Sequence, residues 1–186
     1  MTESPQYTVL KKDKNIELRQ YAGYIQAEVD VNGSSYQSAI SSGFNVLAGY
    51  IFGNNVSRES IAMTTPVKVE QSQKIAMTTP VKVTGDGTYT VAFIMPSEFT
   101  LENLPLPKDQ RVRFNPMPAH QAAVIRFSGY FKEDVIARNK QNLREWLSEQ
   151  GLEPAGDFIV AGYNPPWVPG ILARNEVMVE VEGTIP

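Results

Sequence analysis

Apolar and polar residues alternate along most of this chain, and only two stretches repeat at helical spacing. That pattern is typical of a β-sheet that carries two helices. The alternating segments are short and are bounded by glycine, proline, asparagine or aspartate. They predict strands at residues 7–11, 16–21, 24–31, 89–95, 111–114, 121–127, 158–163 and 176–181. Within 24–31, Gln26, Glu28 and Asp30 share one face, which we expect to meet solvent.

Two amphipathic helices are predicted between these strands. The first follows two serines, which suit an N-cap, and ends before Gly53. Its apolar stripe consists of Tyr36, Ile40, Phe44, Leu47 and Ile51. The second runs from about residue 131 to 150, and Gly151 suits its C-terminal cap.

The order of these elements occurs twice: strands, one helix, then more strands. We therefore predict an α+β fold in which a pseudo-twofold, curved antiparallel sheet or distorted barrel carries two amphipathic helices. A chain of 186 residues suffices for one well-buried core, so a single domain over 1–186 is expected.

Composition excludes several classes of function. The chain has no cysteine and one histidine, His120, so it can form no disulfide, thiolate-ligated haem or two-histidine zinc site within itself. Its net charge of −3 gives no broad basic surface for nucleic acid, and no long apolar run predicts a membrane span. The missing cysteines are compatible with a reducing cytoplasm, where we expect the protein. The oligomeric state stays open.

A nine-residue segment occurs twice without change, as Ile-Ala-Met-Thr-Thr-Pro-Val-Lys-Val at 61–69 and at 75–83. Each copy alternates apolar and polar residues and contains a proline, which predicts strands at an edge or bulge of the sheet. Exchange of one copy for the other is a further hypothesis. Met63 and Met77 either fill the core or line a pocket, since methionine serves both uses.

Several motifs in this order resemble the SOUL haem-binding family. Besides the duplicated segment they are Phe-Ile-Met-Pro-Ser (93–97), Val-Ile-Arg-Phe-Ser-Gly (124–129), Ala-Gly-Tyr-Asn-Pro-Pro-Trp (161–167) and Arg-Asn-Glu-Val (174–177). The resemblance covers roughly residues 6–182, the expected core of the domain. It implies a two-helix barrel related to gyrase-inhibitor-like effector-binding domains, and a soluble protein that binds haem or another tetrapyrrole.

The resemblance also implies where the ligand lies, in a mainly apolar cleft. By position in this sequence its lining would be Tyr36, Ile40, Phe44, Leu47, Met63, Met77, Tyr163 and Trp167. Trp167 alternatively covers an edge of the core. The cations that could meet the propionates are Arg58, Lys68, Lys82 and Arg174.

An iron ligand is harder to assign. Some relatives carry a histidine just before the tyrosine of the second strand, but this chain has Gln20 before Tyr21, and glutamine is a poor haem ligand. His120 is the remaining imidazole, although its place beside Pro118 equally predicts an ordinary turn histidine. Burial of a flat apolar ligand is therefore expected to supply most of the affinity.

Two other functions stay open. A hydrolase would use Glu176 as a buried base, yet alternation places Glu176 with Met178 and Glu180 on a face that we expect to be solvated. The chain contains no Gly-x-Ser-x-Gly elbow, phosphate loop or dinucleotide fingerprint. A protein-interaction module would instead use the Met-Thr-Thr-Pro edge strands to pair with another chain.

Overall fold

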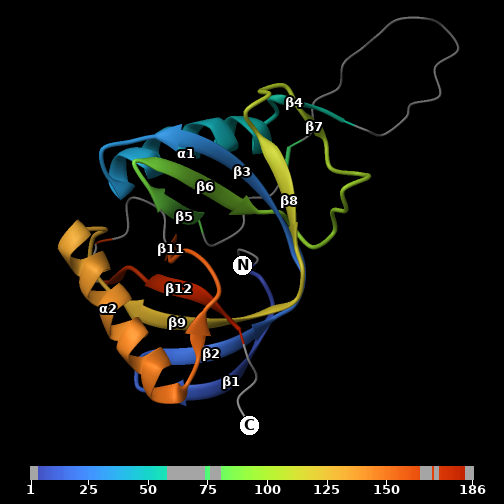
Figure 1. Cartoon of the computed structure of the whole chain (residues 1–186). Helices are drawn as coiled ribbons and strands as arrows, with labels where there is room; N and C mark the ends of the chain where they lie inside the picture. The colour runs from blue at the N-terminus through green and yellow to red at the C-terminus, as the bar shows by residue number, and fades with distance from the viewer. Residues whose placement is uncertain (1–3, 58–73, 76–80, 164–168, 170–171, 183–186) are drawn as a thin grey trace, which may run out of the picture.

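A curled antiparallel sheet with two helices packed on it makes up the computed structural model (Figure 1), which describes residues 4–57, 74–75, 81–163, 169 and 172–182. The strands are β1 (Tyr7–Asp13), β2 (Ile16–Tyr21), β3 (Tyr24–Asn32), β4 (Asn55–Val56), β5 (Val81–Asp86), β6 (Thr88–Ile94), β7 (Leu106–Pro107), β8 (Arg113–Met117), β9 (His120–Phe127), β10 (Glu153–Pro154), β11 (Ile159–Gly162) and β12 (Asn175–Glu182). The helices are α1 (Tyr36–Ile51) and α2 (Glu133–Gln150). The predicted α+β class is confirmed.

The main sheet has the strand order β1-β2-β9-β12-β11-β5-β6-β3-β8, and every neighbouring pair in it is antiparallel. The segment β2-β3-α1-β5-β6 corresponds to β8-β9-α2-β11-β12. In each half the strand before the helix lies between a strand of its own half and the leading strand of the other half. The halves meet where β5 pairs with β11. The prediction of one unit used twice is thus confirmed by the topology.

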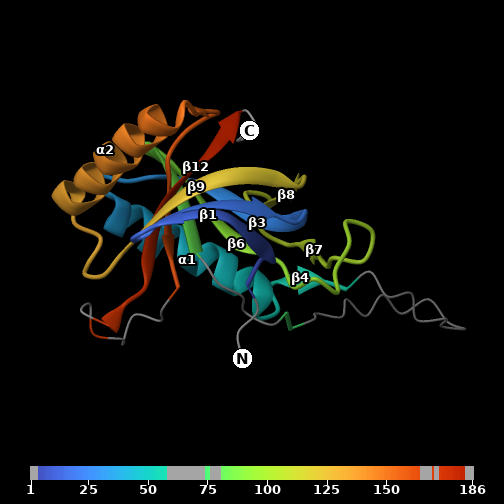
Figure 2. The same ribbon diagram turned by 90° about the horizontal axis from the view of Figure 1, so that it is seen from below.

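The helices lie on the same face of this sheet. Side chains from α1, such as Leu47, and from α2, such as Leu143, belong to one apolar cluster with Val29 and Val177 of the strands. Figure 2 shows α2 beside β12 and β9, with α1 against the other half. A second, smaller cluster around Tyr21 lies on the opposite face, which we call the helix-free face. The sheet therefore separates the main core from a second layer of side chains.

Local signals set the ends of both helices where the sequence predicts them. Ser35 caps α1, since its side chain accepts a hydrogen bond from the backbone N–H of Ser38 at 3.2 Å. Gly151 ends α2 in the left-handed conformation, with φ of 66°. The first helix packs on β6 at Gly43, where a Cβ atom would come within 2.5 Å of Val91. Glycine at this position lets the helix approach the strand closely.

Two expectations about exposure are wrong. Gln26 and Glu28 are buried, and only Asp30 of that face is exposed, because the curl of the sheet brings Arg113 of β8 over Glu28. The second duplicated segment does not supply an edge strand at residues 81–83, since this part of β5 pairs with both β6 and β11. Its proline precedes the paired residues in sequence, so the ladder loses no donor. The first copy lies outside the described residues.

Candidate functional site

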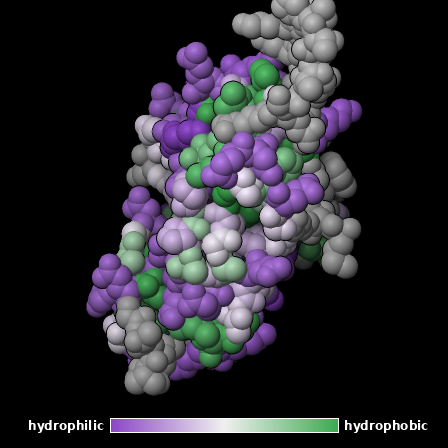
Figure 3. Space-filling view, turned by 90° about the vertical axis from the view of Figure 1, so that its right-hand side faces the viewer, coloured by the Kyte–Doolittle hydropathy of each residue, from purple (hydrophilic) through white to green (hydrophobic). Residues whose placement is uncertain are grey.

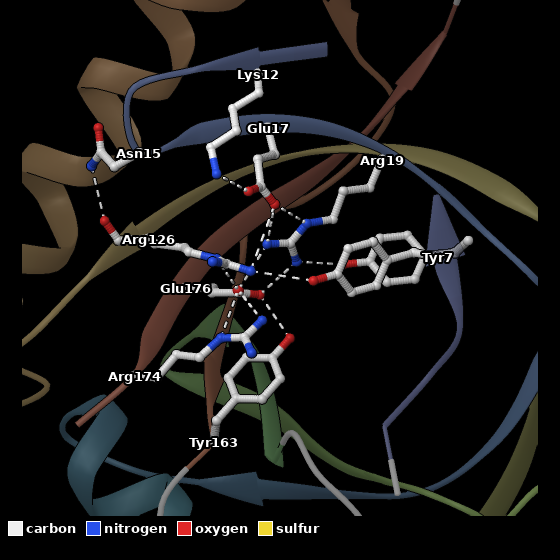
Figure 4. A network of polar contacts seen from close by, with 10 residues as sticks. Tyr7, Lys12, Asn15, Glu17, Arg19, Arg126, Tyr163, Arg174 and Glu176 are labelled. Carbon is white, nitrogen blue, oxygen red and sulfur yellow. Dashed lines mark hydrogen bonds and ion pairs between the residues drawn. The ribbon is translucent and has the colours of Figure 1, made fainter. Parts of the chain in front are cut away.

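A buried network of charged side chains occupies the helix-free face, centred on Glu176 of β12 (Figure 4). Arg19 of β2 donates from its two terminal nitrogens to the two carboxylate oxygens of Glu176, at 2.9 and 3.0 Å. Both side chains have no solvent exposure. The fork geometry of arginine matches a carboxylate, which makes this a strong charge-assisted pair.

Three more side chains hold the same carboxylate. Arg174 and Arg126 donate to Oε1 of Glu176 at 2.8 and 3.2 Å, and the hydroxyl of Tyr163 donates to Oε2 at 2.7 Å. Glu17 accepts from Arg19 at 2.9 Å and extends the network toward solvent. Three guanidinium groups thus surround two carboxylates, and Arg126 and Arg174 are the members that reach water.

This setting gives Glu176 a definite protonation state. Burial raises its pKa, but hydrogen bonds and charge from Arg19, with bonds from Tyr163 and Arg174, outweigh burial and hold the pKa below the ordinary 4.5. The expectation that Glu176 faces solvent is wrong, because the network covers its strand face. A general base at neutral pH needs a raised pKa, so this carboxylate is a structural anion and not a poised base.

The outer face of α1 is the second notable feature, because α1 carries no charged side chain in its 16 residues. Its outward positions hold Gln37, Ser41, Ser42 and Asn45, and the apolar Ile40 and Phe44 are half-buried. The other helix has a charged outer face instead, as expected for a surface helix. An uncharged helix surface is unusual for a solvated position and suits contact with an apolar group.

The structure divides the lining predicted from the sequence. Tyr36 and Leu47 lie in the core, and the Tyr36 hydroxyl already accepts a hydrogen bond from Lys140 at 2.6 Å. Ile40 and Phe44 lie at the margin of that core, partly accessible. Tyr163 belongs with the cluster on the helix-free face. Met63, Met77 and Trp167 lie outside the described residues, as do Arg58 and Lys68.

His120 begins β9 on the helix-free face, where its ring stacks on Tyr21 at 5.3 Å. Its Nδ1 lies 2.8 Å from the carbonyl oxygen of Pro118, which can only accept a hydrogen bond, so Nδ1 carries the proton. Ile40 and Phe44 pack against the cluster on the opposite face of the sheet, so His120 is not placed to ligate a metal held there. Across the described part of the chain no three His, Asp or Glu side chains gather as a metal site.

Two clefts open where strands of the first half meet β8 of the second half. The larger, of about 410 Å³, lies between the N-terminal segment, the turn after β2, and β8, and is lined by Tyr24, Ile25, Ile94, Met95, Phe99 and Met117 among others. The smaller, of about 250 Å³, is lined by Gln26, Glu28, Lys82, Thr84, Thr90, Arg113 and Asn115 among others. Figure 3 views this side of the molecule, where hydrophobic and hydrophilic residues are interspersed. Neither cleft is lined by α1.

The clefts and most of the arginine network cannot be predicted from local sequence patterns. Arg19 and Glu17 lie on β2, far in sequence from Arg126 on β9 and Glu176 on β12, and their shared site depends on these three strands lying side by side. Alternation alone could have placed Arg19 and Tyr21 on one face.

Neither helix in the described part of the chain has the length and apolar content needed to cross a bilayer.

A family model described as SOUL heme-binding protein matches residues 2–180. Among curated proteins, the chain is similar to Heme-binding protein 1 of Xenopus laevis, with 26% identity over 161 residues that cover 87% of this chain and 80% of the relative. Heme-binding protein 1 of Sus scrofa is 28% identical over 168 residues, covering 90% of this chain and 84% of the relative.

Solved structures support the same fold. The C-terminal domain of EcmrR superposes with a TM-score of 0.65 at 12% identity, covering 96% of this chain and 99% of that one. A hydrolase from Listeria innocua superposes with a TM-score of 0.58, also at 12% identity, covering 93% and 94% of the two chains. At such low identity these likenesses establish the shared architecture alone.

Proposed function

Because the chain belongs to the SOUL heme-binding protein family, we propose that it binds haem or a related tetrapyrrole as a carrier, buffer or sensor. The Heme-binding protein 1 relatives, which match over most of their own length, support the proposal. We also propose that the protein lies in the cytoplasm. The expected ligand is flat, apolar on its faces and anionic at one edge.

The observation that carries the proposed site is the absence of charge on α1. A flat apolar ligand covering this face would contact Ile40 and Phe44, whose half-buried side chains already form an apolar surface. Burying a few hundred Å² of apolar surface there would supply several kcal/mol, at about 25 cal/mol per Å². Of the remaining predicted lining, Met63, Met77 and Trp167 stay part of the proposal.

The described residues fit a tetrapyrrole held by burial better than one held by iron. The apolar side chains of α1 suit the faces of the macrocycle, and α1 offers no histidine, methionine or tyrosine on its outer positions. The one histidine of the sequence, His120, lies on the helix-free face. When bound, haem would supply its own optical and redox chemistry, while this chain would bury the ring and exclude water from it.

Titration of the purified protein with hemin and with iron-free protoporphyrin IX, followed by the Soret band, tests the proposal. We expect comparable affinities for the two ligands, and loss of at least about ten-fold in affinity for Ile40→Lys, since it places a charge in the apolar contact. The matched control is Val135→Lys, at a half-buried aliphatic position on α2. Failure of both ligands to bind wild-type protein overturns the proposed function, and binding of hemin alone would show that iron ligation, not burial, supplies the affinity. Binding unaffected by Ile40→Lys overturns the site on α1.

The same titration examines two further residues. His120→Ala should leave hemin affinity unchanged if burial supplies the binding energy, whereas a large loss would identify an iron ligand. Tyr163→Phe should likewise bind normally, because the Tyr163 hydroxyl serves Glu176 on the opposite face. The hydrolase alternative has lost its main support, since Glu176 is held as an anion by arginine.

A further inference from the structure

Lys82 lies in the middle of the sheet, on the helix-free face, and only 6% of it is exposed. Its strand β5 lies between β11 and β6, and its direct neighbours on those strands are Ala161 and Ala92. Both neighbours have short side chains. Burial of a long cationic side chain at such a place costs free energy unless a polar or anionic group binds its amine.

Within the described ranges of the chain, the amine of Lys82 has no anionic partner. It donates to the hydroxyl of Tyr24, and Nζ lies 4.6 Å from the centre of the Tyr24 ring. Among the residues that the structure describes, no carboxylate lies within ion-pair distance of it. Arg19, which is equally buried, has a carboxylate on two of its nitrogens. Lys82 is therefore not held in the way that a structural cation of this sheet is held.

The cleft of about 250 Å³ opens directly at Lys82. Its other walls are mainly hydrogen-bonding side chains, including Thr84, Thr90 and Asn115. Gln26, which is 9% exposed, donates its amide to Glu28, but its carbonyl oxygen Oε1 is buried without a partner. A buried acceptor of this kind costs free energy until a donor meets it. The cleft thus combines an amine with an acceptor that lacks a hydroxyl or amide donor.

Burial also makes a larger fraction of the Lys82 amine unprotonated near neutral pH than is the case for a surface lysine. Loss of solvation lowers its pKa to about 8, and the nearby charge of Glu180 opposes this only in part. Among the described residues, the other ionisable groups near the cleft are Tyr24, Glu28, Asp30 and Arg113, and burial raises the pKa of the Tyr24 phenol, which stays protonated. Near neutral pH an appreciable fraction of Lys82 is the free amine, the nucleophilic form of lysine.

We propose that Lys82 forms a Schiff base with a small hydroxyaldehyde bound in this cleft. The lone pair of Nζ adds to the carbonyl carbon and gives a carbinolamine. The nitrogen then gives up its proton and the former carbonyl oxygen leaves as water, so amine and aldehyde become one imine and one water, with no change of oxidation state. The hydroxyl of the ligand donates to Oε1 of Gln26, and the size of the cleft limits the ligand to a few heavy atoms.

This site is separate from the proposed tetrapyrrole site. Lys82 and Gln26 face the helix-free side, whereas Ile40 and Phe44 pack against the core on the helix side. The two proposals can therefore fail independently.

The test uses glycolaldehyde with sodium cyanoborohydride, which reduces the imine to a stable adduct, followed by peptide mapping of the intact chain. At pH near 7.5, Lys82 should be modified at least about ten-fold faster than Lys12, whose side chain is 61% exposed. Its rate should rise with pH to a midpoint near 8. Modification of Lys82 that is no faster than modification of Lys12 overturns the proposal. This comparison needs only wild-type protein.

Two variants test the role of the acceptor and the lysine. Acetaldehyde lacks the hydroxyl, so wild-type protein should prefer glycolaldehyde, and Gln26→Leu should abolish the preference while retaining modification. A preference that survives Gln26→Leu overturns the assignment of the hydroxyl. Lys82→Met should remove the fast-reacting site and leave the modification of Lys12 unchanged, with circular dichroism as the check of folding. If fast modification at the cleft persists in Lys82→Met, Lys82 is not the reacting amine.

Discussion

Arg19 and Glu176 form a two-fold hydrogen-bonded ion pair across the helix-free face, with donor–acceptor distances of 2.9 and 3.0 Å and no exposure of either side chain. The residues come from β2 and β12, and β9 lies between these strands. Arg126 of β9 and Arg174, just before β12, complete the set. The pair therefore ties the first hairpin of the chain to its last strand.

Removing the carboxylate should be costly mainly because of Arg19. Glu176→Leu removes the carboxylate that binds both terminal nitrogens of Arg19 and leaves Glu17 as its remaining anion, so we expect a loss of about 3–5 kcal/mol in the free energy of unfolding. Adding Arg19→Met should recover part of this loss, because a buried guanidinium with only part of its hydrogen bonds is then gone. Urea unfolding of the single and double variants measures both effects.

Arg174 provides the matched control, since it binds the same carboxylate but its side chain is 40% exposed. Water can solvate Arg174 once Glu176 is absent, so adding Arg174→Met to Glu176→Leu should recover nothing. If both arginine variants recover stability equally, buried charge is not the source of the loss.

The same network predicts acid sensitivity. Burial raises the pKa of both Glu17 and Glu176, but arginine outweighs it and lowers each below the ordinary 4.5. Groups with a depressed pKa stabilise the fold above the unfolded value, and this stabilisation is lost as pH falls through the folded value. The free energy of unfolding should therefore decline below about pH 4.5. It should decline less steeply in Glu176→Leu, and parallel declines from about pH 7 to about pH 3 would contradict this origin.

The sequence predicted the architecture because periodicity and turn residues are local signals. Tyr36 to Ile51 and the strands around it follow directly from spacing, and the repeated order indicated the twofold topology. The burial of Glu176 could not be predicted in this way. Alternation assigns it a face, but which face is covered depends on Arg19, Arg126 and Tyr163, which the fold brings together from distant positions.

The candidate site shows the same limit. The stripe of α1 was predicted correctly, yet Tyr36, Leu47 and Ile51 lie in the core, while Ile40 and Phe44 lie at its margin. Helical spacing defines one stripe and does not divide it between the sheet and a ligand. The sequence indicates Lys82 as a cation that could meet a propionate, but not that it is buried, because its burial depends on β11, which joins the sheet from the far end of the chain.

The duplicated segment gives a prediction about redundancy. Deleting residues 61–74 leaves a single copy in front of the β5–β6 hairpin, whichever copy is regarded as removed. Loop closure depends weakly on length, so we expect the free energy of unfolding to change by less than about 1 kcal/mol. Unchanged hemin affinity would mean that one methionine of the two suffices, and a clear loss would mean that both copies contribute.

Hydrogen exchange measures whether the copies compete for one place in the sheet. The strand β5 continues past the repeat into Gly85, whose φ of 108° and close approach to Thr88 belong to the hairpin that follows the second copy. The first copy is followed by Glu70 and Gln71 instead, so placing the first copy in β5 would remove this turn. We therefore expect the amides of Lys82 and Val83 to be protected as strongly as those of β6. Markedly weaker protection would support exchange.

Two glycines of α1 give opposite predictions for one substitution. Gly43 faces β6, and a methyl group there would come within 2.5 Å of Val91, so Gly43→Ala should cost about 1–3 kcal/mol as the helix moves away from the strand. Gly49 has no atom within 4 Å of that position, so Gly49→Ala should stabilise the fold by about 0.5–1 kcal/mol through reduced entropy of the unfolded chain. Thermal unfolding compares the two. Equal effects would mean that α1 is not seated on β6 through Gly43, and hemin titration of Gly43→Ala would then show whether the seating of α1 matters to its outer face.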